Sequence, residues 1–342
     1  MPLARRLVIV CCLGLLASPL SGCAFAKPPR PMASRPRHGA VVSVSPHASR
    51  IGRDVLKRGG NAVDAAVAVG FALAVTWPEA GNLGGGGFMM VHRAGSDPVM
   101  IDYRETAPAT STEAMFQPGE SVHTAKAVGV PGTVRGLGLA HERYGKLMWK
   151  ELLMPAVNLA EAGFRVRLPL ARSLNAILNK AGGEFDELQR VYSKPKGGPW
   201  LIGDRLVQPD LAGTLRQIAK AGPDAFYDGF IAEQIVAEMK TGGGLIRQDD
   251  LAGYQAKLRT PIHTTFRGFD VYGPAPPSSG GITLAMMLNI LENFDLNEHG
   301  RYSAQSLHLM IESMRRAFAD RAQYLGDADF VDIPNFLISK IY

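Results

Sequence analysis

The sequence predicts a layered body of helices and strands, of the α+β or α/β class. Segments with helical apolar spacing dominate, short apolar runs typical of strands interrupt them, and there is no internal repeat or low-complexity tract. With 342 residues, of which 46% are hydrophobic and 20% charged, the chain is long enough to bury a large core. We expect one domain over residues 39–342, preceded by an export segment.

The first 22 residues have the layout of a secretory signal peptide. Arg5 and Arg6 precede an apolar run, Leu7–Leu16, that is too short to span a bilayer. Small residues follow this run, as they do at a cleavage site. We therefore expect export to the bacterial periplasm or cell envelope.

The signal ends in Leu20–Cys23 (LSGC), which resembles the bacterial lipobox. In that motif the cysteine becomes the lipidated first residue of the mature protein. Cys23 is therefore the predicted lipidation site, and the lipid would be the only contact with the membrane. The alternative is simple secretion, with cleavage after Ala24 or Ala26. Residues 23–38, rich in proline and arginine, are predicted to form a semi-extended tether.

Charge and cysteine content exclude several classes of function. The net charge is +6, and much of it lies in the leader and tether, at Arg5, Arg6, Lys27, Arg30, Arg35 and Arg37. A nucleic-acid partner would need a basic stripe interleaved with aromatic residues on one element, and the sequence has none. Cys11, Cys12 and Cys23 all lie at or before the predicted cleavage point. The mature chain therefore has no thiol for a disulfide, a metal site or a nucleophile.

The expected elements follow from apolar periodicity and from capping residues. Strands are expected at Ala40–Val44, Phe88–His92 and Val99–Tyr103, and a hairpin at Pro261–Phe266 and Phe269–Tyr272. Helices are expected at Ser49–Arg58, Val63–Thr76, most of 132–239, Ile282–Leu291 and Ser303–Tyr324. The helix Val63–Thr76, capped by Asn61, is apolar nearly all round and should be buried.

Two patterns near the end of the chain predict further structure. One face of the Ser303–Tyr324 helix has the spacing of a core stripe, formed by Leu307, Met310, Ile311, Met314 and Phe318. Pro334 could open a further helix, but residues 335–342 allow only about two turns, which is too short to be stable alone.

The glycine-rich segment Gly81–Phe88 (GNLGGGGF) requires a choice between phosphate binding and packing. Gly-rich loops can cradle phosphates with backbone N–H groups. Here no Lys-Ser/Thr follows, and the glycines precede a strand instead of opening a helix. We therefore predict that they allow close packing under a neighbouring element.

The segment Asp102–Pro108 (DYRETAP) lies at the end of an expected strand, where binding residues are common. Arg104 could present its planar guanidinium to a substrate carboxylate, with a geometry that lysine cannot copy. It could equally pair with Asp102 or Glu105 for structure. The residues alone support both roles equally.

No metal or cofactor is predicted. His141–Gly145 begins like the zinc-protease HExxH motif, but the second histidine is missing. Asp327, Asp329 and Asp332 suggest a calcium loop, but the glycine and the closing glutamate of such a loop are absent.

Six segments, in order, resemble the γ-glutamyltransferase (glutathione hydrolase) family, and the resemblance covers nearly everything from residue 39 to 342. They are GGNAVDAAVA at Gly59–Ala68, GNLGGGGFMMV at Gly81–Val91, DYRETAP at Asp102–Pro108, AVGVPGTVRGL at Ala127–Leu137, PAPPSSGG at Pro274–Gly281 and FADRAQYLGDADFV at Phe318–Val331. The resemblance implies the four-layer αββα sandwich of N-terminal-nucleophile hydrolases, incomplete in this chain and without a cofactor.

The resemblance also implies a heterodimer made from one self-cleaving precursor. This chain would be its large-subunit part, truncated before the nucleophile. The N-terminal threonine of the small subunit would attack the γ-glutamyl amide of glutathione or a related compound, with its own α-amine as base. The acyl group would then pass to water or to an amino-acid or peptide acceptor. By the same resemblance, Arg104 matches the arginine that holds the substrate α-carboxylate, and Glu105 and Thr106 support its loop.

No catalytic residue is expected in this chain. His263–Thr265 (HTT) superficially resembles the nucleophile segment, but it precedes PAPPSSGG, which the nucleophile should follow. The chain alone is therefore expected to be inactive and to expose a large apolar face. One alternative is a catalytically silent truncated lipoprotein that only binds a ligand or partner. Another is a relative that acts on a different amide, as a cephalosporin-acylase-like or capsule-polymer transferase.

Overall fold

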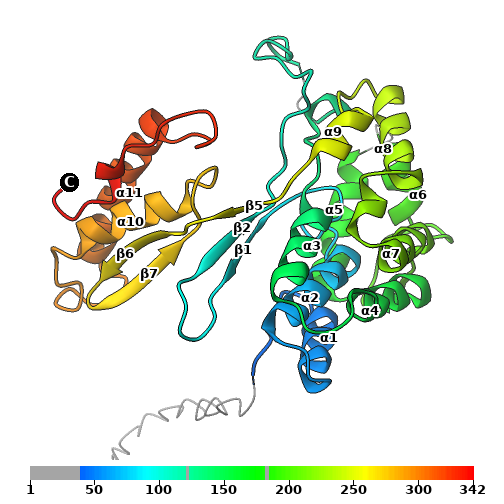
Figure 1. Cartoon of the computed structure of the whole chain (residues 1–342), viewed down its shortest axis with the longest axis horizontal. Coiled ribbons are helices and arrows are strands. Elements are labelled where there is room, and N and C mark those ends of the chain that lie inside the picture. The colour runs from blue at the N-terminus through cyan, green and yellow to red at the C-terminus, as the bar shows by residue number, and fades with distance from the viewer. Residues whose placement is uncertain (1–38, 121–122, 182–184) are drawn as a thin grey trace, which may run out of the picture. The chain divides into compact units, whose positions relative to one another are not determined.

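The computed structural model describes residues 39–120, 123–181 and 185–342 (Figure 1). The predicted signal peptide, Cys23 and the tether at 23–38 lie outside the described residues. The described part of the chain is a mixture of helices and short antiparallel strands. This mixture confirms the predicted α+β class. Within the described ranges, no helix combines the length and the apolar character that crossing a membrane requires.

The larger core is built around helix α2 (Ala62–Thr76). Asn61 Oδ1 accepts the N–H groups of Val63 and Asp64, both at 2.9 Å, and the Asp64 carboxylate accepts the Asn61 N–H at 2.8 Å. This capping box begins the helix as predicted. The expected burial is also confirmed, because most of its side chains are enclosed. The helices in contact with it are α1 (Pro46–Lys57), α3 (Thr133–Tyr144) and α4 (Trp149–Ala162).

The segment between residues 125 and 253 is mostly helical, as predicted for 132–239. Its remaining elements are η1 (Ala125–Ala127), β3 (Phe164–Arg165), α5 (Leu168–Ala181), α6 (Asp186–Tyr192), β4 (Arg205–Leu206), α7 (Pro209–Ala221), η2 (Pro223–Phe226), α8 (Phe230–Thr241) and α9 (Gln248–Gly253). The short strands β3 and β4 pair antiparallel with each other. Apolar side chains from α5, α7, η2 and α8 enter the same core as α2.

An antiparallel sheet of order β1-β2-β5 lies next to this helical body. Its strands are β1 (Phe88–Val91), β2 (Val99–Asp102) and β5 (Lys257–Arg259). Asp102 is opposite Lys257, and Met100 is opposite Arg259. Because opposed residues, and residues two apart, lie on the same face of a sheet, these four side chains share one face. The two predicted strands are confirmed, each one residue shorter, whereas β5 was not anticipated.

A second, smaller core lies in the C-terminal part of the chain, around Ile282, Met286, Ala317 and Leu337. The predicted hairpin and both predicted helices are confirmed there. The elements are β6 (Ile262–Phe266), β7 (Phe269–Gly273), α10 (Gly280–Leu291), α11 (Ala304–Tyr324) and η3 (Asn335–Ile338). The hairpin turns through Arg267 and Gly268, which both have positive φ, at 51° and 84°. Such a two-residue turn matches the twist of the paired strands.

One predicted strand is wrong. Ala40–Val44 is not a strand, and Val42 and Val44 are 91% and 64% exposed. β-branched residues favour extended backbone, but a strand also needs a neighbour to bond, and no described residue pairs with this segment. Residues 335–342, expected to be too short for a stable helix, form only the 3₁₀ turn η3, Asn335–Ile338. Such a short segment cannot offset the cost of starting an α-helix.

The stripe of α11 that was predicted to lie in the core is not buried. Its members are between 40% and 54% exposed: Leu307, Met310, Ile311, Met314 and Phe318. The helix instead buries a face of small residues, Ser306, Ser313 and Ala317, and packs on α10. Among the described residues, α11 therefore presents an apolar stripe to solvent. We call these five residues the α11 stripe. Their exposure agrees with the expectation that the chain leaves a large apolar face uncovered.

Candidate functional site

The loop that carries Arg104 leaves the sheet at the end of β2. Arg104 is exposed, and its guanidinium forms no hydrogen bond or ion pair with any residue that the structure describes. It lines a cleft of about 610 Å³ together with Gly84, Glu105, Thr106 and Lys126. The ammonium of Lys126, by contrast, is bound to Glu120 at 2.5 Å and to the Met115 carbonyl at 3.1 Å. Arg104 thus offers unpaired donors to this cleft.

The backbone of Arg104 is held on both sides although its side chain is not. Its N–H donates to Asp102 Oδ1 at 3.1 Å, and its carbonyl accepts the Tyr254 hydroxyl at 2.8 Å. The Tyr254 phenol is protonated at neutral pH, and burial raises its pKa further above the ordinary value, so it remains a hydrogen-bond donor. The position of the loop is thereby fixed before any ligand binds.

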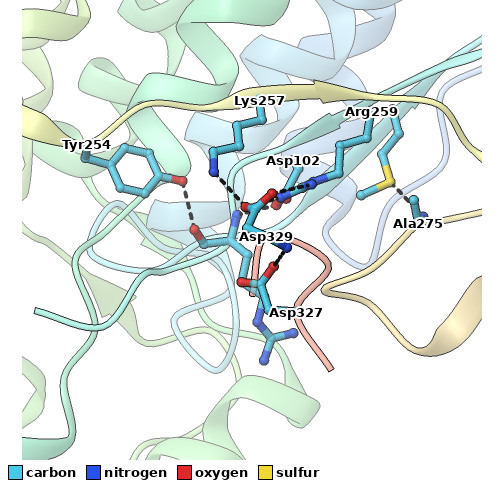
Figure 2. A network of polar contacts seen from close by, with 9 residues as sticks. Asp102, Tyr254, Lys257, Arg259, Ala275, Asp327 and Asp329 are labelled. Atoms are coloured by element: carbon cyan, nitrogen blue, oxygen red, sulfur yellow. Dashed lines mark hydrogen bonds and ion pairs between the residues drawn. The ribbon is translucent and has the colours of Figure 1, made fainter. Parts of the chain in front are cut away.

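Arg104 does not make the structural pairing that the sequence left open. The carboxylate of Asp102, only 6% exposed, is bound by Arg259 Nε at 2.6 Å (Figure 2). No ion pair joins Arg104 to Glu105 in the described part of the chain. Arg259, on the neighbouring strand, has therefore taken the partner that a structural Arg104 would have used.

Glu105 and Thr106 lie in the same loop and line the same cleft. Thr106 forms an isolated β-bridge with Val130. The Thr106 N–H donates to the Val130 carbonyl at 3.3 Å, and the Val130 N–H donates to the Thr106 carbonyl at 2.8 Å. The bridge connects DYRETAP to the AVGVPGTVRGL segment. The structure therefore brings together two motifs that the sequence separates.

Glycines surround Tyr103, the residue before Arg104. A Cβ on Gly86 would come within 2.5 Å of the Tyr103 carbonyl oxygen, and one on Gly136 within 2.1 Å of its ring. Neither approach is compatible with a side chain, so the glycines allow this tyrosine to pack closely. Its burial raises the Tyr103 pKa to about 12. These contacts agree with the packing role predicted for the glycine run.

A network of charged side chains extends from Asp102 to the loop after α11 (Figure 2). The Arg259 guanidinium binds both carboxylate oxygens of Asp329, at 3.0 and 2.7 Å, and Lys257 Nζ binds the same carboxylate at 2.6 Å. These hydrogen bonds, Arg259 first and then Lys257, hold the pKa of Asp329 well below its usual range. Sequence reasoning did not identify Lys257 or Arg259 as parts of this site, since no local pattern relates them to residues so far away in the sequence.

The motifs set aside in the sequence make other contacts. No group of three or more His, Cys, Asp or Glu side chains within the described ranges could hold a metal ion. The His141 imidazole contacts the Leu147 carbonyl at 2.7 Å. Thr264, in the middle of β6, is buried, and its hydroxyl donates to Asn289 Oδ1 at 3.1 Å. His263 and Thr264 are therefore parts of a paired strand.

Comparison with known proteins identifies the family. The gamma-glutamyltranspeptidase family model matches residues 48–342. The glutathione hydrolase proenzyme of Escherichia coli (strain K12) is 45% identical over 349 residues, which cover 96% of this chain and 60% of that protein. The acylase ACY 1 proenzyme of Pseudomonas sp. (strain SE83) is 41% identical, over 89% of this chain and 57% of that protein.

Solved structures agree with this match. The crystal structure of Helicobacter pylori gamma-glutamyltranspeptidase has a TM-score of 0.88 and 41% identity, covering 90% of each chain. The α+β fold is thus shared with solved gamma-glutamyltranspeptidases. The chain spans 60% or less of the length of the two curated relatives above. The family model and these relatives together show that the chain belongs to the gamma-glutamyltranspeptidase family.

Proposed function

We propose that the protein containing this chain hydrolyses the γ-glutamyl amide of glutathione and related compounds, or transfers the γ-glutamyl group to an amino acid or peptide. Family membership supports the reaction class. The observation that carries the substrate assignment is Arg104, which lines a cleft, has an unpaired guanidinium among the described residues, and has its backbone fixed. A planar, permanently charged fork of this kind suits the α-carboxylate of a γ-glutamyl group.

The direct test is to incubate the purified full-length protein with glutathione and to measure released glutamate. We expect glutamate release, and formation of a new γ-glutamyl peptide when a dipeptide acceptor is added. If glutathione remains intact under both conditions, the γ-glutamyl proposal fails, and the protein is either catalytically silent or acts on another amide.

A second candidate is an amide substrate of another kind, because an acylase proenzyme is among the relatives. Such a substrate need not carry an α-carboxylate on its acyl group, and without one Arg104 would have no anion to bind. Cleavage of such an amide by the full-length protein at a higher rate than cleavage of glutathione would favour this candidate.

The partner in this proposal is a small subunit from the same precursor, whose N-terminal threonine is the nucleophile. The relatives named proenzymes are longer than this chain, and the α11 stripe is an apolar surface for the additional sequence to cover. Glu105 and Thr106 support the loop that presents Arg104 in the same assembly.

Charge placed in the α11 stripe should weaken the association of the subunits. We expect the double substitution Ile311→Glu and Met314→Glu to reduce co-elution of the two subunits in size-exclusion chromatography, because charged groups would have to be desolvated. Gln323→Glu, at an exposed polar position of the same helix, is the matched control and should co-elute normally. Unchanged co-elution of the double variant would mean that the stripe lies outside the subunit contact.

The proposal places the protein in the bacterial periplasm or cell envelope, anchored by lipid on Cys23. The support is the LSGC motif after a signal-like segment. Metabolic labelling with a radioactive fatty acid should mark the parent protein and leave Cys23→Ala unlabelled. Absence of label from both would leave simple secretion as the export route.

A further inference from the structure

The contacts around Arg104 form one continuous chain that reaches a distant motif. It begins at the Arg104 backbone, whose N–H is held by Asp102 Oδ1 at 3.1 Å and whose carbonyl is held by Tyr254. The second oxygen of the same carboxylate, Oδ2, is bound by Arg259 Nε at 2.6 Å. Asp102 therefore contacts the binding loop with one oxygen and the neighbouring strand with the other.

The ion pair between Asp102 and Arg259 is buried. Asp102 is 6% exposed and Arg259 is 15% exposed, so removing either partner would leave the other charge buried and uncompensated, at a large cost in free energy. The register of the sheet sets the path from Arg259 to Asp102, because Asp102 is opposite Lys257 and Arg259 lies two residues further along β5. Arg259 therefore crosses diagonally to Asp102 on the shared face.

The outer half of the Arg259 guanidinium binds the loop after α11. Its two terminal nitrogens contact the two oxygens of Asp329, at 3.0 and 2.7 Å. Asp327 shapes this loop, since its side chain accepts the Asp329 N–H at 3.0 Å and its carbonyl accepts the N–H groups of Phe330 and Val331. Figure 2 shows Asp102, Arg259, Asp329 and Asp327 in this sequence of contacts. The GDADFV part of the last motif is thus joined to the loop of DYRETAP.

We propose that Asp102, Arg259 and Asp329 are positioning residues for Arg104, so that docking of the 327–331 loop sets how well the protein binds the substrate α-carboxylate. The inference rests on the proposed function, because it assigns Arg104 to that carboxylate. A bidentate fork binds well only when its backbone is held in one place, and small displacements of a binding group cost much affinity. Asp329 acts through Arg259 and Asp102 and touches no substrate.

The test is the kinetics of Asp329→Asn in the full-length protein with glutathione. We expect KM to rise roughly tenfold and kcat to stay within about twofold, because the fork is displaced and the chemistry is not. Asp329→Glu, which keeps the carboxylate, should restore much of the affinity. Glu187→Gln, which breaks an exposed arginine pair on α6, is the matched control and should leave KM unchanged. Arg259→Lys, which keeps the charge and loses the fork, should raise KM as Asp329→Asn does.

A double variant separates this inference from the proposed function. If the network acts through Arg104, Asp329→Asn should cause no further rise in KM in an Arg104→Ala background. An equal rise in both backgrounds, or no rise in the parent, would overturn the positioning role. If Arg104→Ala itself leaves KM unchanged, the assignment of the carboxylate to Arg104 has failed, whatever Asp329→Asn does.

Discussion

Replacement of Arg104 by alanine is expected to raise the KM for glutathione about 100-fold and to change kcat little. A charge-assisted bidentate contact contributes about 1.5–3 kcal/mol, and each 1.4 kcal/mol corresponds to a factor of ten. The guanidinium has no partner among the described residues, so its removal leaves no protein group unsatisfied. The loss should therefore appear in substrate binding and not in the stability of the fold. Initial-rate kinetics over a range of glutathione concentrations would measure it.

Two companion variants test the geometry. Arg104→Lys keeps the charge and loses the planar fork, so we expect an intermediate rise in KM of roughly tenfold. Arg53→Ala removes an exposed arginine of α1, which pairs with Asp54, and should leave KM at the parent value. A KM for Arg104→Ala equal to that of the parent would remove the carboxylate role, and with it the main support for a γ-glutamyl substrate.

The largest expected effect on stability comes from Asp64, which is fully buried at the start of α2. Its carboxylate accepts three backbone N–H groups, from Asn61 at 2.8 Å, Lys146 at 2.9 Å and Leu147 at 3.3 Å. Asp64→Ala removes half of the capping box and leaves these three N–H donors without their acceptor, so the free energy of unfolding should fall by about 3 kcal/mol. Urea unfolding, followed by circular dichroism, would measure the change.

Asp210→Ala is the control for this substitution. Asp210 also lies in the first turn of a helix, α7, but its side chain is 69% exposed. Exposed carboxylates of this kind contribute little to stability, so the free energy of unfolding of Asp210→Ala should stay within about 0.5 kcal/mol of the parent value. Equal losses for the two variants would mean that the buried contacts of Asp64 are not the cause.

Elements with complete local signals were predictable from the sequence. Helix α2 has its cap, its first-turn acid and its apolar surface within one short segment, and all three appear as expected. The β6–β7 hairpin is similarly marked by Arg267-Gly268 between two strand-like runs. In each case the contacts that decide the structure lie within a few residues of each other, so no knowledge of the rest of the fold is needed.

Predictions failed where the outcome depends on a distant neighbour. The periodicity of α11 shows that one face is apolar, but it cannot show which face another element covers. Ala40–Val44 has strand composition, but no strand in the described part of the chain pairs with it. For the candidate site, the resemblance singled out Arg104, whereas the partners of its backbone lie up to 150 residues away. Lys257 and Arg259 carried no local pattern that would have marked them.

The long separations in this network have a consequence for the order of events during folding. Arg259 is 157 residues beyond Asp102, and Asp329 is a further 70 residues along. Contacts between distant residues form slowly because long loops must close first. Helix α2 depends on local contacts and can form early, whereas the frame of Arg104 is complete only after the 327–331 loop has docked. The loop to which we assign carboxylate binding therefore reaches its final position later than α2 forms.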